Sequence, residues 1–147
     1  MTKDLSLKSS AFEAGKLIPK KYTCDGRGIN PALTIEGIPI EAKTLVLIMD
    51  DPDAPSGTFD HWVVWNIPAS TSKIGENTVP GMEGMNGARQ MGYFGPCPPS
   101  GTHRYFFKVY ALDTELGLRV GSKKKDVEKA IQGHILAKGE LIGLYSR

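Results

Sequence analysis

The sequence predicts a fold dominated by β-strands, with one helix near its C-terminal end. Seventeen glycines and ten prolines separate short apolar segments along most of the chain, which is the pattern of strands joined by tight turns. From Ser122 onward the pattern changes to apolar residues at helical spacing. With 147 residues and no repeat, linker or low-complexity block, the chain is expected to form a single domain over residues 1–147.

The predicted strands follow the apolar segments. The segment TLVLIM, residues 44–49, is apolar almost throughout, as expected of a central strand that is covered on both faces. Strands are predicted near residues 5–9, 16–23, 32–36, 43–50, 60–67 and 103–112.

One segment has the features of a helix. The stretch SKKKDVEKAIQGHI begins with a serine that can cap a helix, and Val127, Ala130 and Ile131 follow at helical spacing. A helix is therefore predicted from about residue 122 to 136. Gly139 interrupts the pattern, and the residues ELIGLYS that follow it are predicted to form a short last strand.

Charge and hydropathy exclude several classes of protein. The chain has 18 basic and 16 acidic residues, for a net charge of +2, which predicts no nucleic-acid partner. The basic cluster Lys123 to Lys125 is followed at once by DVEK and is interpreted as a solvated helix start. Because no apolar run is long enough for a secretory signal or a transmembrane segment, a cytoplasmic location is predicted.

The chain contains two cysteines, Cys24 and Cys97. Their spacing is typical neither of a zinc site nor of a disulfide framework. They could pair in an oxidising compartment. Since stable disulfides are rare in the cytosol, two reduced, structural thiols are predicted.

Polar residues stand where two of the predicted strands begin. Side chains two positions apart in a strand lie on the same face. His61 is therefore expected to share a face with Val63 and Trp65, and His103 is expected to share one with Tyr105. Each strand begins polar and turns apolar, which predicts a small polar mouth at one edge of the core.

Two loops flank these histidines. In the first, Asp51 and Asp53 extend a face of the preceding strand only if the extended backbone persists through Pro52, and aspartates beside proline are also ordinary turn formers. In the second, three prolines and three glycines within residues 92–101 fix a backbone path that could hold an anion or form a structural corner. A histidine at a strand start is often simply hydrogen-bonded, and His134, on the predicted helix, is given no site role.

Three motifs together carry a resemblance to a known family. DPDAP at residues 51–55, HW at 61–62 and GPCPPSGTHRYFFKVYALD at 95–113 resemble the phosphatidylethanolamine-binding protein family, in its short bacterial and archaeal branch that is also called Raf-kinase-inhibitor-like. IPKKYTCDGRGINPAL and QGHILAKGELIGLYSR, towards the two ends of the chain, are similar to that branch as well. The resemblance implies an antiparallel β-sandwich of one large and one small sheet, with an anion-binding pocket at one end. Residue by residue, that pocket would be formed by Asp51, Asp53, Pro55, His61, Gly95, Pro96, His103 and Tyr105.

The resemblance implies a binding protein and not an enzyme, with no catalytic residue, no cofactor and no metal. The implied ligand is a small anion such as phosphate or a phosphorylated headgroup, with regulation through ligand or protein binding. Homodimerisation is compatible with the resemblance to prokaryotic relatives. The residue types suit an anion, since imidazole, the tyrosine hydroxyl and backbone N–H groups are donors, and the carboxylates are expected to fix the histidine tautomers and favour imidazolium. Asp50 and Asp60 are expected to shape turns only.

Other functions remain open at this point. An inhibitor that docks on a protease or kinase would share the fold. A metal-dependent hydrolase could use Asp51, Asp53, His61 and His103 as ligands. A nucleophilic hydrolase based on Ser100 or Cys97 is less favoured, because neither residue lies in a G-x-S-x-G setting.

Overall fold

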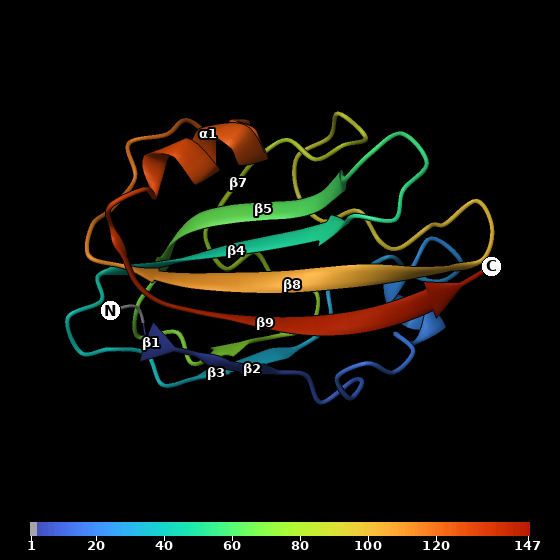
Figure 1. Ribbon diagram of the computed structural model, residues 1–147, viewed down its shortest axis with the longest axis horizontal. Helices are drawn as coiled ribbons and strands as arrows, with labels where there is room; N and C mark the ends of the chain where they lie inside the picture. Colours follow the sequence, from blue (N-terminus) through green and yellow to red (C-terminus); the bar gives the residue numbers. More distant parts are fainter. Residues whose placement is uncertain (1–2) are drawn as a thin grey trace.

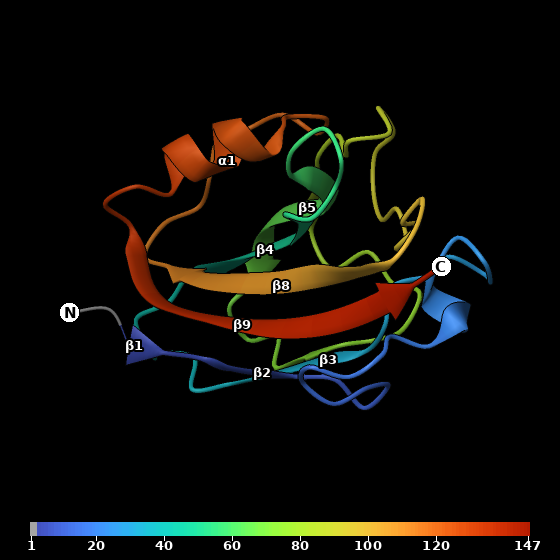
Figure 2. The same ribbon diagram turned by 45° about the vertical axis from the view of Figure 1, so that its right-hand side comes forward.

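The computed structural model describes residues 3–147 and contains two β-sheets, with one helix on the outside of the larger sheet (Figures 1 and 2). In chain order the elements are β1 (Lys3–Asp4), β2 (Ser6–Lys8), the 3-10 helix η1 (Lys20–Tyr22), β3 (Leu33–Glu36), β4 (Thr44–Asp51), β5 (Phe59–Pro68), β6 (Lys73–Ile74), β7 (Met82–Glu83), β8 (Thr102–Leu112), α1 (Lys124–Ala130) and β9 (Ile135–Ser146).

The larger sheet has the strand order β1-β9-β8-β4-β5-β7, and the smaller sheet has the order β2-β3-β6. Neighbouring strands run antiparallel throughout, except that β1 pairs with β9 in parallel. The predicted sandwich of one large and one small sheet is confirmed, and the β1–β9 pair makes the large sheet mixed.

The two faces of the large sheet are covered by different elements. The small sheet packs on one face, called the inner face here, and α1 packs on the other, the outer face (Figure 2). Strand β4 lies between β8 and β5 and is buried at every position, which confirms the central strand predicted from TLVLIM. The inner core includes Leu33, Ile35, Leu47, Met49, Trp62 and Phe107. The outer core includes Val46, Ile48, Val63, Trp65, Val127 and Ile131.

Two element boundaries differ from the prediction. Residues 16–23 form no strand beyond an isolated bridge between Leu17 and Leu144; the backbone turns into η1 instead, after Pro19 with its φ of −60°, because proline lacks the N–H that a ladder needs. The helix α1 is shorter than expected, since the chain turns at Gly133, where φ is +80°, a conformation that favours glycine.

Strand β9 is longer than the short last strand that was predicted. It runs through Gly139 without interruption. A Cβ atom at Gly139 would collide with the backbone carbonyl of Leu5. The glycine thus permits the N-terminal segment to approach β9 closely and does not end the element.

The prediction of two reduced thiols is wrong. Cys24 and Cys97 form a disulfide with Cα atoms 5.4 Å apart and a sequence separation of 73. It joins the turn after η1 to the loop before β8. The approach of the two segments depends on Gly95, where a Cβ atom would lie 2.6 Å from the carbonyl oxygen of Tyr22.

No helix within residues 3–147 is long and apolar enough to cross a membrane.

The disulfide should contribute measurably to stability. A crosslink across 73 residues restricts the unfolded chain, and native disulfides of this kind contribute roughly 2–4 kcal/mol. The double variant Cys24→Ser/Cys97→Ser should lose about that much free energy of unfolding in urea denaturation. The reduced wild-type protein is the control and should match the double variant. Equal stabilities of the oxidised wild type and the double variant would contradict this account.

Candidate functional site

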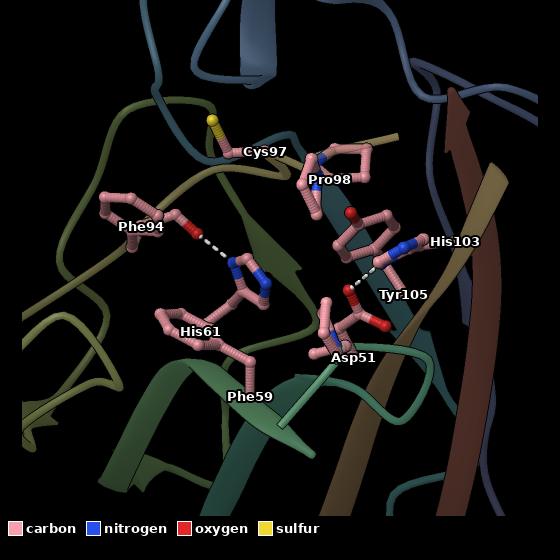
Figure 3. A pocket seen from close by; sticks show the side chains of 11 residues that line it. Asp51, Phe59, His61, Phe94, Cys97, Pro98, His103 and Tyr105 are labelled. Carbon is pink, nitrogen blue, oxygen red and sulfur yellow. Dashed lines mark hydrogen bonds and ion pairs between the residues drawn. The ribbon is translucent and has the colours of Figure 1, made fainter. Parts of the chain in front are cut away.

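A cavity of about 120 Å³ lies at the end of the sandwich where β4 ends and β8 begins. Figure 3 shows its walls. The polar lining residues are Asp51, His61, His103 and Tyr105, and the others are Ala54, Pro55, Phe59, Phe94, Cys97, Pro98 and Pro99. All four polar side chains belong to residues that are less than a tenth exposed, so the cavity combines a buried polar cluster with an apolar rim.

Strand alternation brings three of these polar residues together. Met49 belongs to the inner core, and Asp51 follows it two positions later, at the end of β4. On the adjacent antiparallel strand β8, His103 and Tyr105 alternate onto the same face as Phe107. Because antiparallel neighbours place the end of one strand beside the start of the other, Asp51 meets His103.

His61 reaches the cavity by a different route. The expectation that it shares a face with Val63 and Trp65 is wrong, because β5 contains a bulge. Trp62 pairs with Met49 and Asp60 pairs with Asp50, which leaves His61 unpaired. The bulge turns its side chain toward the inner face, where the His61 ring centroid lies 5.2 Å from that of Tyr105.

The protonation of His61 follows from its surroundings. Its Nδ1 lies 2.6 Å from the carbonyl oxygen of Phe94, and because a carbonyl can only accept, Nδ1 carries the proton and donates. Burial lowers the pKa of His61, and the Phe94 carbonyl and the carboxylate of Asp51 oppose this only in part. His61 is therefore neutral at pH 7, with Nε2 as an acceptor, which corrects the expectation that the carboxylates hold both rings as imidazolium.

His103 forms a buried pair with Asp51. Its Nδ1 donates to Oδ2 of Asp51 over 2.7 Å, and the side chains are only 10% and 4% exposed. The other oxygen of Asp51 accepts the backbone N–H of Asp53 at 2.8 Å. The carboxylate thus fixes the His103 tautomer and leaves Nε2 available to a ligand, as a donor whenever the ring carries a second proton.

The hydroxyl of Tyr105 is buried in this cluster and has no partner in full hydrogen-bond geometry among residues 3–147, although the Asp51 side chain and the Cys97 backbone lie close enough to act on its pKa. Burial, and after it the carboxylate of Asp51, raises the pKa of Tyr105, so the hydroxyl keeps its proton and remains a donor. A buried donor without a partner costs about 1–3 kcal/mol. An unsatisfied donor in a cavity wall is what a polar ligand would satisfy.

Asp53 lies outside the cavity. Its two carboxylate oxygens accept from the guanidinium of Arg104 at 2.9 Å each, and one of them also accepts the Arg104 backbone N–H at 2.9 Å. These hydrogen bonds lower the pKa of Asp53 to about 2. Asp53 therefore ties the turn after β4 to the start of β8 and faces away from a ligand.

The eight residues implied by the resemblance divide into two groups. Those that line the cavity are Asp51, Pro55, His61, His103 and Tyr105. Asp53, Gly95 and Pro96 do not line it; Gly95 packs against Tyr22 and Thr23, and the Pro96 carbonyl accepts the N–H of Cys24 at 3.1 Å. Gly95 and Pro96 thus support the cavity wall on its side away from the cavity.

Sequence reasoning missed much of the apolar rim. Phe59 and Phe94 lie with ring centroids 4.7 and 6.0 Å from that of His61. Both stand next to motifs that were identified, Phe59 just before DHW and Phe94 just before GPCPP. Their position beside polar motifs was the available signal, but an aromatic residue in a β-protein is more often a core residue.

Asp50 and Asp60 do more than shape turns. Asp50 is 2% exposed and accepts from the ammonium groups of Lys108 at 3.1 Å and Lys124 at 3.2 Å. Lys124 also lies 3.0 Å from Asp60. This cluster holds the start of α1 onto the outer face, opposite the cavity.

Within residues 3–147, no group of three or more His, Cys, Asp or Glu side chains is arranged to hold a metal ion. The Nδ1 atoms of His61 and His103 are both engaged in hydrogen bonds, and Asp53 is engaged by Arg104.

The buried, neutral His61 should make stability depend on pH. Its pKa in the folded state lies below the ordinary value of 6.5, so the unfolded chain binds a proton more readily as pH falls below about 6.5. The stability associated with neutral His61 is complete above that pH and declines below it, by at most about 1.4 kcal/mol per pH unit. His61→Gln keeps a donor for the Phe94 carbonyl and removes the titration, so its free energy of unfolding should fall less steeply between pH 6.5 and 5.

Urea denaturation at a series of pH values measures this difference. His134→Gln is the comparison variant, because it makes the same substitution at a histidine that is nearly half exposed. Identical slopes for His61→Gln and the wild type would show that His61 is not buried in its neutral form.

Comparison with known proteins places this architecture in a family. The sequence model of the family described as phosphatidylethanolamine-binding protein matches residues 8–146. A protein of Methanothermobacter thermautotrophicus named UPF0098 protein is 50% identical and aligns over 97% of this chain and 99% of its own length. A UPF0098 protein of Chlamydia trachomatis is 43% identical over the same shares.

Solved structures agree with this match. The crystal structure of CT736 from Chlamydia trachomatis, described as a phosphatidylethanolamine-binding protein homologue, has a TM-score of 0.95 with 42% identity and covers 99% of each chain. Escherichia coli YbcL, described as a new member of the mammalian family, has a TM-score of 0.90 with 27% identity and covers 98% of this chain and 99% of its own. The chain therefore belongs to the phosphatidylethanolamine-binding protein family, as the motifs DPDAP, HW and GPCPP led us to expect.

Proposed function

We propose that this chain is a non-enzymatic binding protein whose cavity holds a phosphate monoanion, either free or as a phosphate monoester headgroup. The observation that carries the proposal is the unpartnered hydroxyl of Tyr105, fully buried in the wall of a cavity between two imidazoles. The Nδ1 atoms of both rings are occupied. Their Nε2 atoms and the hydroxyl are the polar atoms left for a ligand.

The protonation states select the form of the ligand. Tyr105 and, when charged, His103 donate to phosphate oxygens, whereas neutral His61 accepts a hydrogen bond through Nε2. A phosphate monoanion supplies both the acceptors and the one donor that this arrangement needs. The dianion of a phosphate monoester has no proton for His61. The dianion of free phosphate keeps one, but either dianion is repelled by the carboxylate of Asp51 more strongly than the monoanion is.

The size of the cavity favours a headgroup. Its volume of about 120 Å³ is well below the roughly 300–1,000 Å³ of pockets that enclose drug-sized ligands. A phosphate group with a small substituent fits this scale, and two acyl chains do not. The apolar rim of Phe59, Phe94, Pro98 and Pro99 can cover the substituent.

The alternatives from the sequence receive less support. A metal-dependent hydrolase that uses both aspartates would need Asp53, which Arg104 holds outside the cavity. No particular surface feature within residues 3–147 favours docking on a protease or kinase.

Tyr105→Phe should separate binding from stability. Losing a hydrogen bond to a charged group costs about 1.5–3 kcal/mol, so the affinity for inorganic phosphate should fall about ten- to hundredfold. The fold should be as stable as the wild type or more so, because a buried, unsatisfied hydroxyl disappears. Calorimetry with inorganic phosphate and urea denaturation measure the two quantities. Tyr110→Phe, on the half-buried outer side of β8, is the control, and equal phosphate affinities of Tyr105→Phe and the wild type would refute the proposed site.

The role of His61 as an acceptor predicts a preference between esters. Methyl phosphate can offer its P–OH proton at pH 6, whereas dimethyl phosphate has none. The monoester should therefore bind more tightly than the diester at pH 6, by about three- to tenfold for one hydrogen bond. Its affinity should decrease toward pH 8, as its second ionisation near pH 6 removes the proton. Calorimetry with both compounds at pH 6, 7 and 8 tests this, and equal affinities at pH 6 would exclude the acceptor role.

A further inference from the structure

The disulfide lies directly behind one wall of the cavity. Cys97 is one of the lining residues, and Figure 3 shows its sulfur turned away from the rings of His61 and Tyr105. Its partner Cys24 is exposed, whereas Cys97 is half-buried. The S–S bond is therefore accessible from outside through Cys24, while Cys97 belongs to the wall.

The wall that the disulfide holds also orients His61. The N–H of Phe94 donates to the His61 carbonyl at 2.9 Å, and the Phe94 carbonyl accepts Nδ1–H of His61 at 2.6 Å. Apart from the disulfide, two hydrogen bonds attach residues 93–97 to η1 and the turn after it. The Tyr93 hydroxyl donates to the carbonyl of Tyr22 at 2.7 Å, and Cys24 N–H donates to the carbonyl of Pro96 at 3.1 Å. The wall can therefore remain folded without the covalent link, but with fewer constraints.

A cation stands beside the disulfide. Nη1 of Arg147 lies 3.3 Å from Sγ of Cys97 and 3.8 Å from Sγ of Cys24, and Nη2 lies 3.4 Å from a carboxylate oxygen of Asp25. A neighbouring guanidinium stabilises a thiolate, and a stabilised thiolate is the better leaving group in thiol–disulfide exchange. Sγ of Cys97 lies nearer to the guanidinium than Sγ of Cys24 does, so Cys97 is the better leaving group of the two.

We propose that the Cys24–Cys97 disulfide is a thiol-exchange site that controls the ligand affinity of the phosphate cavity. Sγ of Cys24 is the atom attacked, and Sγ of Cys97, beside Arg147, is the leaving group. A thiolate of a reductant, either a dithiol or a monothiol, attacks Sγ of Cys24. A new S–S bond forms there, the Cys24–Cys97 bond breaks, and its electron pair leaves on Sγ of Cys97. A second thiolate then attacks the reductant's sulfur in the mixed disulfide, Cys24 leaves and takes up a proton, and the reductant is oxidised to its own disulfide.

Reduction changes the cavity because it loosens the wall that holds His61. A less preorganised wall binds its ligand more weakly. By thermodynamic linkage, a ligand that binds the oxidised form more tightly makes the disulfide harder to reduce by the same factor. This consequence for the ligand rests on the proposed phosphate binding, whereas the exchange chemistry and the loosening of the wall do not.

The first part of the experiment identifies the sulfur that is attacked. The oxidised protein is exposed briefly to β-mercaptoethanol, quenched with acid and digested, and the mixed disulfide is located by mass spectrometry. It is expected on Cys24, with Cys97 free, and Arg147→Gln should slow the exchange about threefold or more. Arg119→Gln, which removes an exposed arginine away from the disulfide, should leave the rate unchanged. A mixed disulfide mainly on Cys97, or equal rates for Arg147→Gln and the wild type, would overturn the assignment.

The second part measures the wall and the cavity in the oxidised and the reduced protein. Reduction by dithiothreitol should leave the far-ultraviolet circular dichroism unchanged and should increase hydrogen exchange of the backbone amides of residues 93–97. Calorimetry with inorganic phosphate should show an affinity about five- to tenfold lower in the reduced protein, and saturating phosphate should shift the reduction equilibrium by the same factor. Cys24→Ser should behave like the reduced protein.

The outcomes separate the two proposals. Equal hydrogen exchange of residues 93–97 in the two redox states, or equal phosphate affinities, would overturn the redox control of the cavity. If phosphate binds neither form, the proposed function fails, and the hydrogen exchange and the mixed-disulfide analysis decide the exchange site on their own.

Discussion

The coverage of β4 on both faces is the constraint on which the rest of the structure depends. The small sheet covers its inner side and α1 its outer side, so all eight of its residues are buried. The polar side chains of β4 therefore stand at its ends, and at its C-terminal end two aspartates are adjacent. Alternation sends Asp50 outward to Lys108 and Lys124 and Asp51 inward to His103. One carboxylate fastens the helix, and the other organises the cavity.

The cavity is held in a state that is unfavourable for the free protein. An unpartnered tyrosine hydroxyl is buried there, and it costs free energy that the large apolar core offsets. The neutral His61 beside it would cost free energy only if it had to take up a proton. Energetic costs of this kind are common at sites that are preorganised for a ligand. The bulge at His61 belongs to the same arrangement, because it breaks the regular pairing of β5 in order to turn one side chain inward.

The sequence allowed the layers and part of the cavity to be predicted, because both depend on local patterns. The run TLVLIM indicated a doubly covered strand, and alternation correctly placed His103 and Tyr105 together. The same rule misplaced His61, since a bulge is a property of how two strands pair and leaves no mark in one of them. The direction of Asp53 depends on Arg104, which lies 51 residues away. The state of Cys24 and Cys97 depends likewise on a tertiary approach, which Gly95 permits.

The aspartate pair also bears on how β4 finds its place in the sheet. A strand that is apolar on both faces carries little information about register, because a shift by one residue exchanges one apolar face for another. The polar residues at the two ends of β4 specify the register that its apolar middle leaves open. At the N-terminal end the Thr44 hydroxyl donates to the carbonyl of Thr114 at 2.6 Å. At the C-terminal end Asp50 pairs with lysines on the outer face, and Asp51 pairs with His103 on the inner face. A slipped strand would separate these groups from their partners and place an unpaired carboxylate against the core, so misregistered pairing is penalised at both ends, and the residues that form the site also protect the chain against misfolding.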